Sequence, residues 1–133
     1  MRGQRLIKFA VATLGAALLA GAPAQAFQTK AFDAQTFKAA QSAGDPILVD
    51  VFAPWCSTCK AQQQVLDKLQ DKPEFAKLTV FKVDFDNQPD VVKSFGARSQ
   101  STLIAYKGAA EVGRSAGDTA PKSIEALLSS TVK

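Results

Sequence analysis

The sequence predicts an α/β fold built as one domain. Strand-like apolar runs alternate with helix-like segments between residues 30 and 130. Their order is strand–helix, strand–helix, then a hairpin and a last helix, with Gly and Pro at the breaks between them. Because the sequence contains no repeat, low-complexity tract or long linker, we expect these elements to pack as a single domain.

A short helix and a buried strand open this domain. Asp33 is expected to cap a helix that runs through Phe37 and Ala40. Ser42–Pro46 ends that helix, because it holds Gly and Pro close together. Ile47–Phe52 then predicts a strand that is buried on both faces.

The second helix and the second strand follow. Apolar residues after the cysteines recur at helical spacing, which predicts a helix that packs one face on the sheet. These residues are Ala61, Val65, Leu66 and Leu69. Leu78–Asp84 predicts the next strand, and the crossover between the two strands should be right-handed.

The C-terminal part predicts a helix, a hairpin and a last helix. Pro89–Phe95 is expected to be a short helix. Thr102–Tyr106 and Glu111–Ser115, joined by a turn at Lys107–Gly108, predict the hairpin. Thr119 and Pro121 are expected to open a helix whose apolar face consists of Ile124, Leu127 and Leu128.

Residues 1–26 predict a cleaved secretory signal. Three basic residues precede the apolar stretch Phe9–Ala20. A small-x-small pattern then allows a signal peptidase to cut after Ala26. The apolar stretch is short for a membrane span, which needs about 20 residues, and an uncleaved anchor is the alternative. Residues 27–133 are then the mature domain, and we expect it in the periplasm.

The basic character of the chain comes largely from this leader. The net charge of the whole chain is +4, and Arg2, Arg5 and Lys8 supply most of it. The mature domain is therefore nearly neutral, and nothing indicates a nucleic-acid partner.

The two cysteines of the chain, Cys56 and Cys59, lie between a predicted strand and a predicted helix. If Cys56 opens the helix and Cys59 follows one turn later, a disulfide can join them. The helix start stabilises a thiolate at Cys56, which makes it the attacking sulfur. Cys59, expected to be the more buried of the two, then resolves the mixed disulfide.

Other uses of the pair are less favoured. A structural disulfide normally closes a longer loop than two residues. Zinc would need further ligands, and the chain has no third cysteine and no histidine. A metal shared between two chains stays open as an alternative. The disulfide itself is the expected redox group, with no separate cofactor.

The segment Ile47–Lys60 resembles the strand and active-site segment of the thioredoxin family. Lys82–Asp86 is similar to the central strand of that family, and Ser101–Gly108 to its loop and hairpin. The resemblance covers nearly all of residues 30–130. It implies a thioredoxin fold, with a central mixed β-sheet flanked by α-helices on both faces, and dithiol–disulfide exchange with client proteins that contain disulfides.

The resemblance also implies roles for three further residues. Asp50 stands where the family has a buried carboxylate, and this makes it a proton acceptor for Cys59. Lys82 is similar to the lysine partner of that carboxylate. Trp55 would flank the exposed sulfur and offer an apolar surface to clients. The alternatives are that Asp50 ends a strand, that Lys82 is solvated and that Trp55 belongs to the core.

Two positions depart from the family. Ser57 and Thr58 stand between the cysteines, where oxidising relatives often have a histidine, and this favours a milder oxidant or a reductant. Ser101 replaces the proline that normally follows a cis bond, and a cis bond at Gln100–Ser101 would cost about 3–4 kcal/mol. With Thr102, Ser101 would form a substrate-facing loop. Its N–H and hydroxyl can hydrogen-bond a thiolate or a client backbone, and the loss of the proline ring can admit a metal beside the sulfurs; the alternative is that Ser101 simply serves the turn.

The sequence thus predicts an exported, monomeric thiol–disulfide oxidoreductase that acts mainly as a reductant in cell redox homeostasis. An integral-membrane thiol transporter is the implied electron donor. A soft-metal carrier that binds Cu(I) through Cys56 and Cys59 is the alternative. An isomerase is less favoured, because the chain has no spare segment for a dimerisation domain. The sequence names neither the client nor the direction of electron flow.

Overall fold

The computed structural model describes residues 21–23 and 25–133. Most of the predicted signal segment therefore lies outside the described residues. The elements are β1 (Gln28–Ala31), α1 (Ala34–Ser42), β2 (Pro46–Phe52), α2 (Ser57–Leu69), a 3₁₀ turn (Pro73–Phe75), β3 (Thr79–Asp84), α3 (Pro89–Ser94), β4 (Thr102–Lys107), β5 (Ala110–Ala116) and α4 (Pro121–Ser129).

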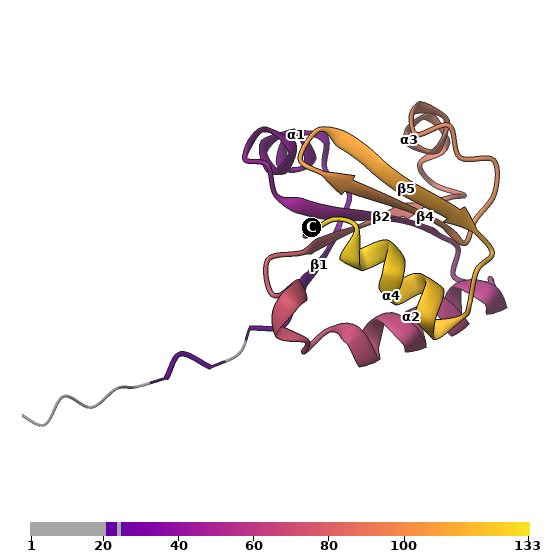
Figure 1. Ribbon diagram of the computed structural model, residues 1–133. Coiled ribbons are helices and arrows are strands. Elements are labelled where there is room, and N and C mark those ends of the chain that lie inside the picture. Colours follow the sequence, from indigo (N-terminus) through magenta and orange to yellow (C-terminus); the bar gives the residue numbers. More distant parts are fainter. Residues whose placement is uncertain (1–20, 24) are drawn as a thin grey trace, which may run out of the picture.

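The five strands form one mixed sheet in the order β1-β3-β2-β4-β5. β1 and β2 run parallel to β3, whereas β4 is antiparallel to β2 and β5 is antiparallel to β4. α1 and α3 cover one face of the sheet, and α2 and α4 cover the other (Figure 1). The predicted fold, a mixed sheet between two layers of helices, is confirmed.

Each face of the sheet has its own hydrophobic core, because successive side chains of a strand point to opposite faces. In β2, Leu48 packs with the residues of α2 and α4, whereas Val49 and Val51 pack on the α1 and α3 side. The second core is aromatic, and the Phe37 ring lies edge-on to the Phe81 ring. Every strand residue from Ile47 to Val51 is buried, as the sequence predicts for β2.

The predicted helices and strands are present with shifts of one or two residues at their ends. Asp33 caps α1, and its carboxylate accepts a hydrogen bond from the Thr36 amide at 2.8 Å. β4 and β5 form the predicted antiparallel hairpin. Pro121 is the first residue of α4, which agrees with the preference of proline for that position.

Two features of the fold differ from the prediction. The edge strand β1 was not predicted, because its four side chains are all exposed and show no apolar alternation. Thr119 was expected to open α4 together with Pro121, but the helix begins at Pro121 and its N-cap residue is Ala120. No side chain caps the first amides of α4, and Asp118 instead braces the turn before it: its carboxylate accepts from the Ala120 amide at 2.9 Å and from the Ser123 hydroxyl at 2.5 Å.

Within the part of the chain that the structure describes, no helix has both the length and the apolar character needed to span a membrane.

Candidate active site

The two cysteines lie at the turn between β2 and α2. Cys56 is the N-cap residue of α2, and the amide of Cys59 donates a hydrogen bond to its Sγ at 3.1 Å. The Cys56 amide donates to Ala53 O at 3.1 Å, which closes the turn after the strand. A disulfide joins the two cysteines across a Cα–Cα distance of 5.3 Å. A sulfur thus takes the place that a serine or aspartate oxygen usually has at a helix start.

The relative burial of the cysteines differs from the expectation. Cys59 was expected to be the more buried, but Cys56 is 4% exposed and Cys59 is 8% exposed. Both residues are buried, and the Cys56 sulfur, which accepts from the Cys59 amide, lies against the start of its own helix. Ala53 packs in the same cluster, and the partly buried Phe52 and Phe85 pack against it.

Asp50 lies inside the sheet, 3% exposed, on the strand that leads to the cysteines. Burial raises its pKa above the ordinary value, while the nearby Lys82 ammonium acts in the opposite direction. Lys82 Nζ lies 3.5 Å from Asp50 Oδ2, because the parallel register of β2 and β3 places the two residues side by side. The structure therefore brings together the carboxylate and the lysine that the sequence singled out.

Two further contacts fix the Lys82 ammonium. Its Nζ donates to Gln63 Oε1 at 3.1 Å and lies 4.4 Å from the centre of the Phe52 ring. Gln63 in turn donates to Asp67 at 2.7 Å on the surface of α2. A polar chain thus leads from the buried carboxylate to the outside of the helix.

Trp55 lies on the surface beside the cysteines, with 62% of the residue exposed. Its indole N–H donates to Asp86 Oδ2 at 2.7 Å. Asp86 belongs to the loop after β3, which the Asp84 carboxylate orders by accepting the Asp86 and Asn87 amides at 3.0 and 3.1 Å. The core alternative for Trp55 is therefore wrong, and its ring is available to another molecule.

Ser101 lies beside the carboxyl end of β2 in the antiparallel register of β4, where Thr102 pairs with Val51. The Gln100–Ser101 bond is trans. Among the described residues other than glycine, Ser101 alone has a positive φ, 59°. This left-handed conformation costs an L-residue about 1–2 kcal/mol. The chain thus accommodates the missing proline by backbone strain at Ser101 and not by a cis bond.

The side chains of this loop turn toward their own backbone. Ser101 is 7% exposed and its hydroxyl donates to Gln100 O at 2.6 Å. The Thr102 hydroxyl donates to Ser99 O at 2.8 Å. Both hydroxyl hydrogens are therefore used within the loop.

Sequence reasoning missed Gln62, a buried amide in α2. Its Nε2 donates to Ser101 O at 3.0 Å and to Asp118 O at 2.9 Å. The available signal was a glutamine on the helix face that otherwise carries apolar residues, three positions after Cys59 and three before Val65.

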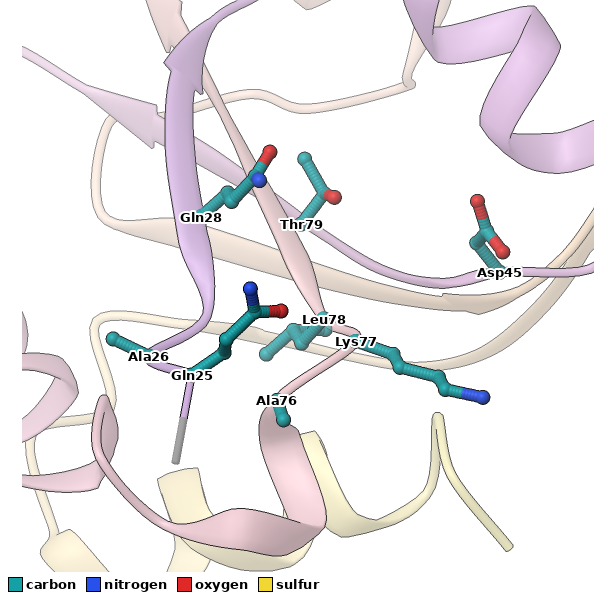
Figure 2. A pocket seen from close by; sticks show the side chains of 8 residues that line it. All are labelled: Gln25, Ala26, Gln28, Asp45, Ala76, Lys77, Leu78 and Thr79. Atoms are coloured by element: carbon teal, nitrogen blue, oxygen red, sulfur yellow. The ribbon is translucent and has the colours of Figure 1, made fainter. Parts of the chain in front are cut away.

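The arrangement allows dithiol–disulfide exchange, and a buried carboxylate, Asp50, lies on the strand that leads to the cysteine turn. No group of three or more His, Cys, Asp or Glu side chains in the described ranges is arranged to hold a metal ion. A polar hollow of about 430 Å³ lies where β1 and β3 begin, and Gln28, Lys77 and Thr79 are among the residues that line it (Figure 2). The cysteine turn follows the other end of the sheet, so the hollow is separate from the cysteines.

Comparison with known proteins identifies related chains. The sequence model of the family described as Thioredoxin matches residues 25–130. The thioredoxin of Alicyclobacillus acidocaldarius is 32% identical over 97 residues, which are 73% of this chain and 91% of that protein. Thioredoxin 1 of Nostoc sp. is 40% identical over 67 residues, 50% of this chain and 62% of that protein.

A solved structure agrees over a longer stretch. The crystal structure of Trxlp from Edwardsiella tarda EIB202 superposes with a TM-score of 0.74 at 40% identity. The match covers 76% of this chain and 98% of that chain. The likeness therefore extends over most of the described chain.

Proposed function

This chain belongs to the thioredoxin family of thiol–disulfide oxidoreductases, and on that premise we propose that it reduces disulfides in client proteins outside the cytoplasm. The redox group is the Cys56–Cys59 disulfide, which is part of the protein. The observation that carries the proposal is the contact between the Cys59 amide and Cys56 Sγ at the start of α2. In the reduced protein the same amide and the helix N-terminus would stabilise a Cys56 thiolate.

The exchange takes two steps. The Cys56 thiolate attacks one sulfur of a client disulfide, so that a Cys56–client disulfide forms and the other client sulfur leaves as a thiolate. Cys59 then loses its proton and attacks Cys56 Sγ, which releases the second client thiolate. Two electrons pass to the client, and the Cys56–Cys59 disulfide forms again.

In this proposal Asp50 accepts the proton of Cys59. It is a buried carboxylate on the strand that ends just before the cysteine turn. Burial raises its pKa, so it holds a proton more readily than an exposed aspartate does. Lys82 Nζ, at 3.5 Å, stabilises the carboxylate when that proton leaves.

The reducing direction is supported by the residues between the cysteines. Ser57 and Thr58 carry no positive charge that would further stabilise the Cys56 thiolate, and a less stabilised thiolate gives a less oxidising disulfide. The test is the equilibrium potential of the Cys56–Cys59 pair against glutathione. We expect a value close to thioredoxin, about −270 mV, and a value near that of DsbA, about −120 mV, would overturn the reductant assignment.

Export completes the proposal. The pattern of residues 1–26 supports secretion to the periplasm, where sustained reduction needs electrons from a membrane thiol transporter. Expression of the whole chain in a bacterial host, followed by N-terminal sequencing of the periplasmic fraction, tests this step. We expect the mature chain to begin at Phe27, and an intact leader on cytoplasmic protein would contradict it.

The alternative function is a soft-metal carrier, in which the sulfurs of Cys56 and Cys59 would be the metal ligands. The loss of the proline ring at Ser101 was expected to open the site to such a metal, and the Ser101 hydroxyl itself donates to Gln100 O. No specific contact of the described residues favours a carrier over exchange chemistry, so the carrier is not proposed.

A further inference from the structure

Gln62 is a polar side chain in an apolar place. It lies one turn after Cys59 in α2 and is 1% exposed. Burying an amide is unfavourable unless its polar atoms find partners. Both hydrogens of the amide nitrogen are used, whereas Oε1 has no hydrogen-bond partner in the described part of the chain. The two hydrogen bonds that Gln62 donates therefore offset the cost of burying its amide.

These two bonds join two loops that lie far apart in the sequence. One goes to Ser101 O, before β4, and the other goes to Asp118 O, after β5. Ser101 O also accepts from the Gly117 amide at 2.9 Å. The carbonyl of Ser101 therefore has two donors, one from α2 and one from the Gly117–Asp118 turn.

The conformation of Ser101 explains why such donors are needed. Its φ of 59° is one that a residue with a side chain adopts only when its surroundings hold it there. No proline ring restricts the backbone at this position. The bonds from Gln62 and Gly117 to the Ser101 carbonyl provide the restraint, since they fix the direction of the strained peptide.

We propose that Gln62 is a positioning residue for client binding: it ties the Ser101 loop to the Gly117–Asp118 turn and so shapes the backbone that an extended client segment meets. The proposal rests on the proposed exchange with protein clients. Both donor hydrogens of Gln62 go to carbonyl groups, so the residue donates to neither sulfur. Its loss should therefore weaken the binding of a protein substrate and leave the chemistry of the cysteine pair unchanged.

The test uses Gln62→Met, which keeps the length of the side chain and removes both donors. Gln64→Met, an exposed position of the same helix, is the matched control. The readouts are KM and kcat for insulin reduction, the rate of disulfide reduction by dithiothreitol, and the potential against glutathione. For Gln62→Met we expect KM for insulin to rise about tenfold, as for the loss of one or two hydrogen bonds. We expect kcat, the dithiothreitol rate and the potential to stay as in the wild type.

Gln62→Asn is the second variant, because it keeps the amide but draws it back by one methylene. It should raise KM as Gln62→Met does, and the Gly117 amide should exchange with solvent faster in both variants. An unchanged KM in a folded variant overturns the proposal. Equal losses toward insulin and dithiothreitol, or variants that do not fold, also overturn it, because Gln62 would then serve the reaction centre or stability alone. A wild-type protein inactive on insulin would instead contradict the proposed function.

Discussion

At the scale of single residues, Asp50 shows how two opposing effects set one property. Burial in β2 destabilises its charged form, and the Lys82 ammonium at 3.5 Å stabilises it. Burial is the larger effect, so the pKa of Asp50 is raised. The resemblance to the thioredoxin family predicted a buried carboxylate at this position, and its burial is what raises the pKa.

The raised pKa of Asp50 predicts a pH-dependent cost in stability. The folded state holds the proton of Asp50 more tightly than the unfolded state, whose pKa is near the ordinary value of 3.8. Stability is therefore lost as the pH rises from that value through the raised pKa. The side chain of the Asp50→Asn variant cannot ionise. At pH values above the raised pKa of Asp50, the unfolding free energy of this variant should therefore exceed that of the wild type. Each tenfold difference in proton affinity between the two states corresponds to about 1.4 kcal/mol.

Chemical denaturation of the oxidised protein between about pH 4 and about pH 9 measures this difference, since the range spans the window above the ordinary aspartate pKa. The exposed Asp71 provides the control, because Asp71→Asn should change stability little at any pH. A gain for Asp50→Asn that does not grow with pH, or a loss of stability at high pH, would contradict the assignment.

At the scale of elements, the helices and strands with a buried face could be predicted from the sequence. β2 and the helix α2 carry continuous or periodic apolar residues, and both were found. β1 escaped prediction because it is an exposed edge strand that pairs only with β3. The left-handed Ser101 and the Gln62 bridge escaped as well, since both depend on hydrogen bonds between residues of different elements that lie far apart in the sequence. Local patterns indicate burial and periodicity, but they do not indicate such distant partners.

The cysteine turn gives a second example at this scale. The spacing of Cys56 and Cys59 predicted a disulfide at a helix start, and the structure has one. The spacing did not predict that Cys56 caps the helix through its sulfur, and the expectation that Cys59 is more buried than Cys56 was wrong. Both properties depend on the direction of the cysteine side chains, which the sequence alone does not give.

At the scale of the whole molecule, the sheet brings the active site together from separate parts of the chain. β2 and β3 run parallel, so the cysteine turn and the Asp86 loop follow strands that end at the same edge. β4 is antiparallel to β2, and Ser101 therefore enters the sheet at that edge. The helices on both faces bury the two cores (Figure 1). Trp55 and the disulfide lie in the turn that follows β2 at this edge.

The central claim is that Cys56 attacks a client disulfide and Cys59 resolves the mixed disulfide. The most direct measurement mixes the reduced Cys59→Ala variant with insulin and analyses the products by mass spectrometry without reductant. The account predicts a covalent adduct through Cys56 that dithiothreitol releases, and no such adduct with Cys56→Ala. No adduct with Cys59→Ala, or an equal amount with Cys56→Ala, would contradict it.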